Sequence, residues 1–353
     1  MVSTAIPDKR KITITGGTGF IGIPLIRKLH ELGHKLKLLV RESSDITPFE
    51  GLNNIEYIIG DVRDIESLYR AVNGVDLIYH LAGQVSVWAK DKNSHYNINV
   101  QGAENIAEVA LKNNVILFYM SSFGALGPNP IEITEPTDES FPHADFFINE
   151  YERTKYLGRE KIREFSEKGL KTVILYPGFV YGPGDFNIYG EMVFDIVAGQ
   201  FLGLPGKGEK LFCMTYLDDV IEGMVNLIDR EDLLGQSFVL GGENIKIRDY
   251  LNLIAELAKV KKPRKLPMWG GALYGRLCRF KANLLKKRVP YITPDMVIGM
   301  KYNWAFSSKS AIEKLGYRIT PIREGLSRTI EWYENFIKLY GKNKKKIGIR
   351  MLK

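Results

Sequence analysis

Two residues four positions apart, Tyr151 and Lys155, form a pair that could move a proton. Residues at this spacing share one face of a helix. A tyrosine with an ordinary pKa of about 10 exchanges protons poorly at neutral pH unless a nearby cation favours its phenolate form. The Lys155 ammonium could supply that charge. Chance pairs at this spacing are frequent on amphipathic helices, so the pair alone does not indicate an active site.

Two serines support a catalytic role for this pair. Ser121 and Ser122 directly follow the apolar run 115–120, which is expected to be a strand. A hydroxyl group at the carboxyl edge of a sheet could bind the carbonyl oxygen of a substrate beside the tyrosine. The three residue types together predict proton transfer to or from a substrate oxygen.

A glycine-rich run, Gly16 to Gly22, lies between an expected strand at 11–15 and an expected helix at 23–32. It satisfies both G-x-x-G-x-x-G and G-x-G-x-x-G. Glycines in such a turn let the backbone approach a pyrophosphate, whose charge is met by the N-terminus of the following helix. Because the run stands between a strand and a helix, as the motif requires, we expect it to bind a dinucleotide rather than to form only a tight turn.

The residues that follow the next two expected strands bear on the kind of dinucleotide. An acidic residue about 20 positions after the glycines holds the ribose of NAD, whereas an arginine there favours the 2′-phosphate of NADP. Arg41 comes first and Glu42 second. The expected cofactor is therefore NADP or NAD, with NADP slightly favoured. Asp61 is expected beside the adenine amino group, and a cap for the helix starting at Ile65 is the alternative interpretation.

The elements that would position these residues alternate between strands and helices. Strands are expected at 11–15, 35–40, 55–59, 75–81, 115–120 and 171–176, and helices at 23–32, 65–72, 97–111 and 149–168. Strands that are apolar on both faces predict a parallel sheet covered on both sides. We therefore expect an α/β fold with a doubly wound parallel sheet, the Rossmann fold. Beyond Pro177, turns and amphipathic segments at 218–229, 247–260 and 322–340 predict a smaller, mostly helical C-terminal substrate lobe.

The predicted elements divide the chain into two lobes and a tail. Residues 1–180 are the expected NAD(P)-binding domain, with 210–245 returning to it. Residues 181–209 and 246–340 are the expected substrate-binding lobe, and 341–353 a basic tail. Asp218 and Asp219 are expected to cap a helix before Val220 rather than to act as paired carboxylates. Large aromatic residues of the lobe are expected to pack inside it rather than to form a dedicated wall of the substrate site: Trp269, Tyr274 and Phe280.

Composition excludes several classes of protein. With 353 residues, 45% hydrophobic and 25% charged, the chain matches an ordinary globular protein and contains no long uninterrupted apolar run. The N-terminus lacks the apolar core of a signal peptide, and two cysteines 65 positions apart cannot form a disulfide framework, so a cytoplasmic location is expected. The five histidines fit no metal-binding motif, and no metal site is expected.

Eight motifs in the same order resemble the extended short-chain dehydrogenase/reductase superfamily, which includes the NAD-dependent epimerase/dehydratase family. The resemblance covers roughly residues 10 to 335. The motifs are TGGTGFIG at 15–22, GD at 60–61, HLAG at 80–83, NVQG at 99–102, SS at 121–122, Y-x-x-x-K at 151–155, PGFVYGPG at 177–184 and YLDDV at 216–220. Further strings, among them YMSSFGALG at 119–127 and LPMW at 266–269, are similar to the dihydroflavonol reductase and farnesol dehydrogenase-like group.

The resemblance implies roles for individual residues. Tyr151 would be the general acid/base, and Lys155 would lower its pKa and contact the nicotinamide ribose. Ser122 matches the family's catalytic hydroxyl better than Ser121. Gly83 and Ala103 depart from the usual alanine and threonine of the family. The expected cofactor-binding residues are Gly16, Gly17, Thr18, Gly19, Phe20, Ile21, Gly22, Arg41, Asp61, Val62, Leu81, Ala82, Gly83, Asn99, Tyr151, Lys155, Pro177, Gly178 and Val180.

Three functions are compatible with this resemblance. The first is an NAD(P)-dependent oxidoreductase that interconverts an alcohol and a carbonyl compound through the set Ser122, Tyr151 and Lys155. The alternative is a nucleotide-sugar epimerase or dehydratase with tightly bound NAD, which would need phosphate-binding cations such as Lys207, Lys210 and Arg248. The third is a protein that binds NADPH without turnover, which would have no need of all three catalytic residues. A small-molecule substrate is the expected partner, and a homodimer is an arrangement that the resemblance allows.

The net charge of +8 is unevenly spread. The segment Leu257 to Pro294 holds eleven basic residues and Lys338 to Lys353 seven, with no acidic residue in either, so the rest carries 31 basic against 41 acidic side chains. Neither segment shows a nucleic-acid recognition motif, and no nucleic acid partner is expected. The first segment mixes large apolar residues with arginines and is followed by Lys286, Lys287 and Arg288, a composition suited to weak contact with an anionic membrane surface. A solvated helix is the simpler interpretation, because three glycines weaken a helix there.

Overall fold

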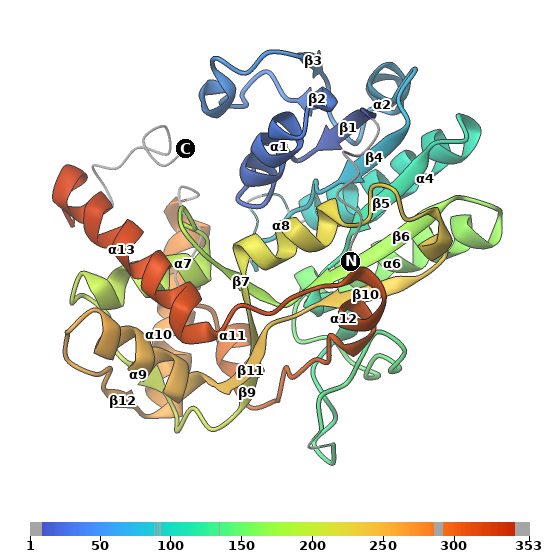
Figure 1. Cartoon of the computed structure of the whole chain (residues 1–353). Coiled ribbons are helices and arrows are strands. Elements are labelled where there is room, and N and C mark those ends of the chain that lie inside the picture. The colour runs from blue at the N-terminus through green and yellow to red at the C-terminus, as the bar shows by residue number, and fades with distance from the viewer. Residues whose placement is uncertain are drawn as a thin grey trace.

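A parallel sheet forms the centre of the computed structural model, which describes residues 9–87, 89, 91, 93–133, 135–285 and 292–342. Within these residues the sheet has seven strands in the order β10-β6-β5-β4-β1-β2-β3 (Figure 1), and every neighbouring pair is parallel. The strands are β1 (Lys11–Thr15), β2 (Lys35–Val40), β3 (Ile55–Ile59), β4 (Leu77–His80), β5 (Ile116–Met120), β6 (Thr172–Pro177) and β10 (Ser237–Leu240).

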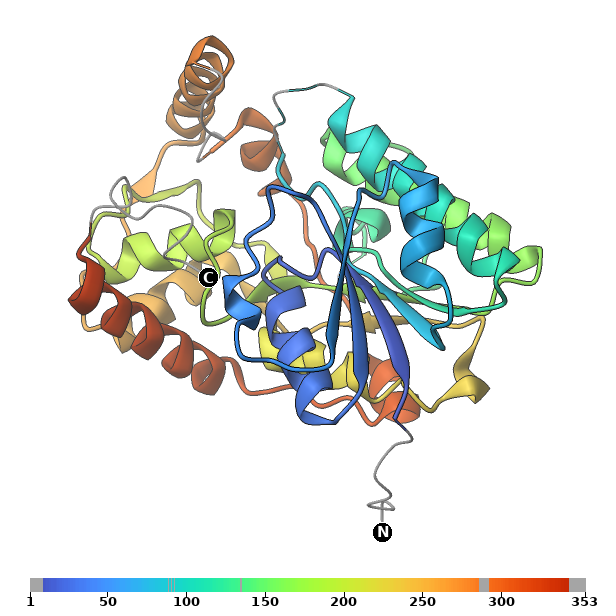
Figure 2. The ribbon, with the colours of Figure 1, turned by 90° about the horizontal axis from the view of Figure 1, so that it is seen from above.

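Helices cover both faces of this sheet, as Figure 2 shows from above. On one face Leu68, Ile106 and Ile162 enter a common core, and on the other Leu25, Val220 and Ala311 enter a second core. The helices of the first face are α2 (Ile65–Val72), α4 (Gly102–Lys112) and α6 (Glu150–Glu167), and those of the second are α1 (Gly22–Glu31), α8 (Leu217–Val225) and α12 (Lys309–Leu315). Strands buried from both sides explain the continuous apolar runs of the sequence.

The chain order of the strands reverses between β1 and β4. From β1 the chain moves outward to β2 and β3, and then returns to place β4 on the other side of β1. In doubly wound sheets, ligands bind at the carboxyl ends of the strands at such a reversal. The glycine-rich turn after β1 therefore lies where a ligand is expected.

A smaller lobe follows, built mostly from helices (Figure 1). Its helices are α7 (Ile188–Val197), α9 (Ile247–Leu257), α10 (Met268–Leu285), α11 (Pro294–Gly299) and α13 (Ile322–Tyr340). Its strands are β7 (Phe179–Tyr181), β9 (Leu211–Tyr216) and β11 (Glu243–Lys246), which form one sheet, and β8 (Leu204–Pro205) and β12 (Lys265–Leu266), which form another. The predicted fold class is confirmed, while the domain boundaries stay a prediction.

Short elements complete the described chain: α3 (Ser94–Tyr96), α5 (Phe123–Leu126), the π-helical turn η2 (Asn97–Gln101) and the 3-10 helices η1 (Thr47–Phe49) and η3 (Glu231–Leu233). The predicted helix at 97–111 thus begins as a wider π turn. A Cβ atom on Gly158 of α6 would lie only 2.2 Å from the Asn99 carbonyl oxygen of that turn. The absence of a side chain at Gly158 lets η2 and α6 approach closely.

Two predictions about side chains are wrong. The helix α8 begins at Leu217 with no side-chain cap, and the Asp219 carboxylate instead accepts hydrogen bonds from the backbone and hydroxyl groups of Thr320. The aromatic residues expected inside the lobe are exposed, with 73% of Trp269 and 68% of Phe280 accessible. Small residues of α10, rather than the large ones, face the protein. Lys286, Lys287 and Arg288 and most of the predicted basic tail lie outside the described residues.

Among the described helices, none is both long enough and apolar enough to cross a membrane.

Candidate active site

The glycine-rich turn is shaped by close backbone contacts. Gly16 adopts a positive φ of 71°, and a Cβ atom there would lie 2.5 Å from the backbone nitrogen of Ala82. A Cβ atom on Gly22 would lie 2.5 Å from the Gly17 carbonyl oxygen. The turn therefore requires glycine at both positions. Helix α1 begins there with no side-chain cap and no acidic residue in its first turn, which suits the binding of an anion at its N-terminus.

The other residues predicted from this motif, Gly17, Thr18, Gly19, Phe20 and Ile21, form the rest of the turn. Gly19 donates from its backbone to the Gly16 carbonyl oxygen at 3.0 Å and accepts from Ile23 at 3.1 Å. Gly17 packs against α1, since a Cβ atom there would lie 2.6 Å from Cδ1 of Ile26. The turn and the helix thus form one rigid unit.

The end of β4 is bonded to the end of β1. Leu81 donates from its backbone to the Thr15 carbonyl oxygen at 3.0 Å, and the Thr15 hydroxyl lies 3.0 Å from Nδ1 of His80. These bonds place Leu81, Ala82 and Gly83 next to the glycine-rich turn. The predicted cofactor residues of the first and fourth strands are therefore brought together.

Asn99 joins this edge to α6. Its side-chain oxygen accepts from the backbone of Gln84 at 2.7 Å, and its amide nitrogen donates to the Thr154 hydroxyl at 3.0 Å. A Cβ atom on Gly83 would lie 3.4 Å from the Asn99 oxygen and 3.8 Å from Nζ of Lys155. Glycine in place of the family's usual alanine thus leaves space beside both side chains.

Arg41 and Asp61 lie at the ends of β2 and β3. The Asp61 carboxylate accepts from the Arg63 guanidinium at 2.8 and 2.9 Å and from the Arg63 backbone at 3.0 Å. These hydrogen bonds hold the pKa of Asp61 below its usual value, and the charge of Arg41 contributes in the same direction. The helix α2 is capped by Asp64, whose carboxylate accepts from Glu66 at 3.1 Å. Asp61 is therefore not the cap of that helix, and Arg41 and Glu42 are exposed.

Val62 follows Asp61 and packs at the same end of the sheet. Its carbonyl oxygen accepts from the Asn105 side chain at 3.0 Å, and a Cβ atom on Gly102 would lie 2.9 Å from its side chain. This contact attaches the end of β3 to the start of α4.

Tyr151 and Ser122 meet across the site. The Tyr151 hydroxyl donates to Oγ of Ser122 at 2.7 Å. Ser122 also caps the short helix α5 by accepting from the Gly124 backbone at 3.1 Å. A Cβ atom on Gly124 would lie 3.1 Å from the Tyr151 ring, so the absence of a side chain lets the ring reach the serine. In contrast, Oγ of Ser121 is buried without a hydrogen-bond partner among the described residues.

Lys155 is buried one helical turn after Tyr151. Its ammonium donates to the Met120 carbonyl oxygen at 3.0 Å and lies 5.4 Å from the centre of the Tyr119 ring. Burial lowers the pKa of Lys155 to about 8. Burial raises the pKa of Tyr151 to about 12, with the Ser122 hydrogen bond acting in the opposite direction. The predicted lowering of the Tyr151 pKa by Lys155 is thus not found: burial dominates, and the charge of Glu152 acts in the same direction as burial.

The residues at 177–180 connect the main sheet to the smaller lobe. Pro177 ends β6, and Val180 in β7 pairs with Thr215 of β9. A Cβ atom on Gly178 would lie 2.5 Å from the Cys213 carbonyl oxygen, so these strands can come together only around a glycine.

Glu152 is a site residue that the sequence analysis missed. Its carboxylate accepts from the Ile148 backbone at 2.9 Å and from the Asn149 side chain at 2.7 Å, while the Asn149 side chain accepts from the Glu152 backbone at 3.0 Å. This is a reciprocal cap at the start of α6, and the pattern N-x-x-E at 149–152 signals it in the sequence. Burial raises the pKa of Glu152 to about 7. The cap fixes the helix turn that carries Tyr151.

An aromatic cluster begins at Phe123, the residue after Ser122, and extends into the smaller lobe. Phe123, next to Ser122, stacks on Phe179 with ring centres 3.8 Å apart and meets the edge of Trp304 at 5.5 Å. Tyr189 packs edge-on against Phe179 at 5.0 Å. Phe179 and Trp304 are buried in the core, whereas Phe123 and Tyr189 are half-buried, so the segment after Ser122 is attached to an apolar cluster.

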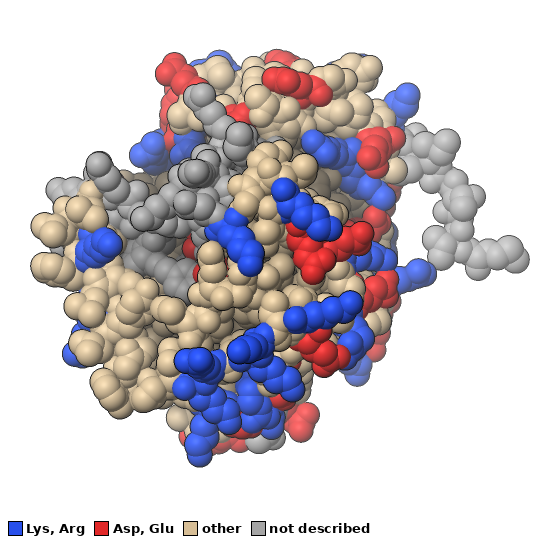
Figure 3. Space-filling model, turned by 90° about the vertical axis from the view of Figure 1, so that its left-hand side faces the viewer, with Lys and Arg blue, Asp and Glu red and all other residues tan. Residues whose placement is uncertain are grey.

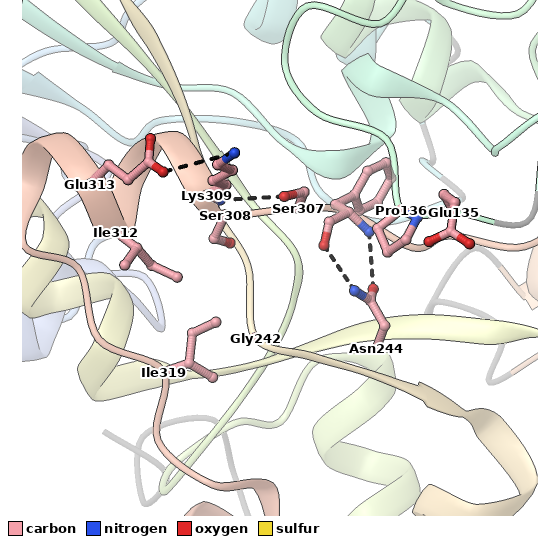
Figure 4. Close-up of a pocket in the computed structure, with 11 residues that line it drawn as sticks. Glu135, Pro136, Gly242, Asn244, Ser307, Ser308, Lys309, Ile312, Glu313 and Ile319 are labelled. Atoms are coloured by element: carbon pink, nitrogen blue, oxygen red, sulfur yellow. Dashed lines mark hydrogen bonds and ion pairs between the residues drawn. The ribbon is translucent and has the colours of Figure 1, made fainter.

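A groove of about 500 Å³ lies elsewhere, between the loops at 135–136 and 306–308 and helix α12 (Figure 4). Its lining contains none of the predicted site residues. Asn244 fixes one wall by a two-way hydrogen bond with the Phe306 backbone, at 3.0 and 2.9 Å. The groove is thus separate from the catalytic pair.

Among the residues that the structure describes, no group of three or more metal-ligating side chains could hold a metal ion. The features that are present fit a dinucleotide: a glycine cradle that a Cβ atom would fill, an uncapped helix N-terminus, and a buried ammonium that binds the end of β5.

Comparison with known proteins agrees with this geometry. A protein of Synechocystis sp. named "Putative dihydroflavonol 4-reductase" is 27% identical over 91% of this chain and 94% of its own length. Sterol demethylase protein B of Methylococcus capsulatus is 30% identical over 71% of this chain and 75% of its own length. The crystal structure of gox2253 superposes with a TM-score of 0.78 at 30% identity, covering 93% of this chain and 99% of the other. The predicted likeness to dihydroflavonol reductases is confirmed, and that to farnesol dehydrogenases stays a prediction.

The model of the NAD dependent epimerase/dehydratase family matches residues 12–241. This match spans the glycine-rich turn, the Tyr151 and Ser122 pair, and all seven strands of the main sheet. The chain therefore belongs to the NAD dependent epimerase/dehydratase family, and it is an NAD(P)-dependent enzyme of the extended short-chain dehydrogenase/reductase type.

Proposed function

We propose that the enzyme interconverts an alcohol and a carbonyl compound, with Tyr151 moving the proton. The observation that carries the proposal is the 2.7 Å hydrogen bond between the Tyr151 and Ser122 hydroxyl groups, with Lys155 on the same helix face as Tyr151. The nicotinamide cofactor, when bound, supplies or accepts the hydride. The glycine-rich turn, Asn99, Lys155 and the residues at 177–180 would hold that cofactor.

The substrate oxygen would lie beside Tyr151 and Ser122, within hydrogen-bond reach of both hydroxyl groups. With a pKa of about 12, Tyr151 keeps its proton at neutral pH and can donate it to the oxygen of a carbonyl substrate. Oxidation of an alcohol needs the reverse transfer, which the Lys155 ammonium would assist by favouring the phenolate. Ser122 would donate a second hydrogen bond to the same oxygen and orient it.

The residues around this pair support an apolar substrate. Phe123 follows Ser122 in the chain and packs against the buried rings of Phe179 and Trp304, so an aromatic cluster adjoins the serine. Aromatic surfaces favour apolar or aromatic molecules. The two named relatives carry names that refer to a dihydroflavonol and a sterol. We therefore propose a hydrophobic ring-containing or isoprenoid alcohol, or its carbonyl counterpart, as the substrate class.

Epimerisation or dehydration of a nucleotide sugar is the alternative function, in line with the family's name. It needs free cations for the diphosphate. Arg248 is one of the three candidates, and its guanidinium already binds Glu209 and Asp249. This pairing weighs against the alternative. Binding of NADPH without turnover is a weaker proposal still, because the hydrogen-bonded pair of Tyr151 and Ser122 serves no purpose in it.

The proposal is tested by mixing the purified enzyme with NAD or NADP and a panel of isoprenoid alcohols, sterols, flavonoid-like compounds and UDP-sugars. Stoichiometric reduction of the added cofactor by an alcohol, followed by its absorbance, is the expected result. An epimerase would instead purify with its cofactor bound and convert a UDP-sugar without net redox change. That outcome would replace the proposed function by the alternative.

A further inference from the structure

Helix α10 (Met268–Leu285) has its large apolar side chains on the outside. Five of them follow the spacing of one helix face, and all five are exposed: Trp269, Leu273, Leu277, Phe280 and Leu284. We call this set the α10 stripe. A surface helix normally turns such a face toward the protein core. The described residues bury none of the stripe, and the helix stands at the outer edge of the molecule, as its orange ribbon in Figure 2 shows.

The opposite face of α10 carries small residues and is closely packed. Gly271, Gly275 and Ala282 are the buried residues of the helix. A Cβ atom on Gly271 would lie 2.7 Å from the Pro205 ring, and one on Gly275 would lie 2.9 Å from the Thr293 backbone. These contacts fix which face points inward. The exposure of the stripe is therefore a consequence of close packing, since the helix cannot turn over without placing large side chains against Pro205 and Thr293.

Basic side chains border the stripe. The chain between α9 and α10 holds five exposed basic residues, the last of them in β12: Lys259, Lys261, Lys262, Arg264 and Lys265. On the helix itself Arg276 and Lys281 are exposed on the two flanks of the stripe. The segment Leu257 to Pro294 contains no acidic residue. Figure 3 shows Lys and Arg side chains gathered on this side of the molecule next to a broad surface that carries few charged groups.

We propose that the α10 stripe lies in the surface of an anionic lipid bilayer. An interfacial helix buries its apolar face among the acyl chains while flanking lysines and arginines contact the anionic headgroups. Trp269 and Tyr274 add aromatic rings of the kind enriched at the boundary between lipid and water. The stripe supplies the apolar face and the basic residues supply the charge, so both parts of such a contact are present on one side of the protein.

A second copy of this chain is a poorer occupant for the stripe. A symmetric dimer through α10 would bring the two basic loops and both copies of Arg276 and Lys281 toward each other, because a two-fold interface pairs the same patch with itself. The Arg279 guanidinium is bound by Asp295, and the segment carries no acidic partner for its other cations. Anionic headgroups would neutralise this charge, whereas a second copy would double it.

The packing of α10 connects this face to the active site. Helix α10 packs on α11 (Pro294–Gly299), and the Trp304 indole donates to the Gly299 carbonyl oxygen of α11 at 3.0 Å. Trp304 in turn meets Phe123 beside Ser122. A membrane-bound α10 would thus hold the catalytic pair near the lipid from which an apolar substrate can be taken. The membrane contact itself does not depend on the proposed function.

The test is sedimentation of the full chain with vesicles of phosphatidylcholine containing phosphatidylserine, and with vesicles of phosphatidylcholine alone. We expect binding to the anionic vesicles at low salt and weaker binding at high salt or without phosphatidylserine. The double variant Leu277→Asp, Phe280→Asp should reduce the partition coefficient by at least roughly tenfold, because it replaces two lipid-facing side chains by charges. Both positions face outward, so the fold should not change, which circular dichroism would check.

Matched variants make the test specific. Leu339 of α13 is 74% exposed and lies outside the stripe, so Leu339→Asp should bind vesicles like the unmodified protein. The variant Lys262→Glu, Lys265→Glu should lose the preference for anionic vesicles, whereas Lys35→Glu, at an exposed position on β2, should keep it. Unchanged binding of Leu339→Asp would support the proposed position of the stripe. Loss of the anionic preference in Lys262→Glu, Lys265→Glu but not in Lys35→Glu would support the proposed role of the basic residues.

Three results would overturn it. The first is a protein that stays in the supernatant with anionic vesicles at low salt. The second is a double variant that sediments like the unmodified protein, which would place any lipid contact elsewhere in the chain. The third is a dimer, seen by light scattering, that Leu277→Asp, Phe280→Asp dissociates without vesicle binding having occurred. That third result would assign the stripe to a second copy. None of these measurements depends on turnover, so a result that contradicts the membrane contact can be told apart from one that contradicts the proposed function.

Discussion

The hydroxyl groups of Tyr151 and Ser122 lie 2.7 Å apart although the two residues are 29 positions apart in the chain. Tyr151 sits in the first turn of α6, which the Asn149 and Glu152 cap fixes, and Ser122 sits at the end of β5. Because each hydroxyl group is held by a different rigid element, the pair can meet a substrate oxygen without rearrangement.

Replacement of Tyr151 by phenylalanine should abolish most of the activity without disturbing the fold. Loss of a general acid/base typically costs about 10²- to 10⁴-fold in turnover, and we expect a fall of kcat in that range with cofactor affinity retained. The measurement is steady-state kinetics together with a cofactor titration. Tyr156→Phe, on the same helix, is the matched control and should turn over normally. Near-normal kcat in Tyr151→Phe would remove this residue from the proposed mechanism.

The two adjacent serines should differ sharply. Ser122→Ala removes the hydrogen-bond partner of Tyr151 and the cap of α5, so kcat should fall by about tenfold to a hundredfold. Ser121→Ala removes a hydroxyl group that has no partner among the described residues, and it should leave kcat nearly unchanged. Steady-state kinetics of both variants measure this difference in kcat. The reverse pattern would transfer the catalytic role to Ser121.

Much of the main sheet could be predicted from the sequence, because its signals are local. Helices α2 and α13 begin and end where the patterns at 65–72 and 322–340 predict. Strands β1, β2 and β3 also match the predicted ranges. The glycines of the first turn indicate a close approach of the backbone, and the apolar runs indicate strands that are buried on both faces. Both signals lie within the segments themselves.

Features that depend on packing between distant segments could not be predicted. The orientation of α10 is set by Pro205 and Thr293, which lie outside this helix, so the predicted burial of Trp269 and Phe280 is wrong. The Asp219 carboxylate binds Thr320, 101 positions away, rather than the start of its own helix. In contrast, the Glu152 cap has a local signal, the pattern N-x-x-E at 149–152.

Lys155 should make the stability of the protein depend on pH. Its pKa is lowered to about 8 in the folded protein from 10.5. Below pH 8 the folded protein bears the cost of a buried charge. As the pH rises from 8 to 10.5, the folded protein releases the proton that the unfolded chain still holds, so this residue's contribution to the free energy of unfolding increases, by an amount on the order of a few kcal/mol.

The variant Lys155→Met tests whether the free energy of unfolding rises with pH in this way. It lacks the titrating group, so the unmodified protein should gain stability relative to the variant between pH 8 and pH 10.5, as measured by urea unfolding of both proteins across that range. A constant difference would mean that the ammonium is not held in a poorly solvated position. At neutral pH the same variant should lose both turnover and cofactor affinity.

Gly16→Ala should disrupt the dinucleotide turn. The new methyl group would lie 2.5 Å from the Ala82 backbone, in addition to the strain of a φ of 71°. Gly74 has a similar φ of 69° but open space around it, so Gly74→Ala should show only the conformational cost of roughly 1–2 kcal/mol. We expect Gly16→Ala alone to weaken cofactor binding, by at least about tenfold. Equal cofactor affinity in the two variants would argue against a cofactor at this turn.

Arg41 should select between the two nicotinamide cofactors. Only NADPH carries a 2′-phosphate, and an arginine that pairs with it forms charge-assisted hydrogen bonds of about 1.5–3 kcal/mol, or roughly tenfold to a hundredfold in affinity. Arg41→Ala should therefore weaken NADPH binding by that factor and leave NADH binding nearly unchanged, as measured by fluorescence titration of each cofactor. Glu42→Ala is the matched control, since loss of its carboxylate should not weaken NADPH binding. If Arg41→Ala affects both cofactors equally and Glu42→Ala selectively weakens NADH, Glu42 holds the ribose and the enzyme prefers NAD.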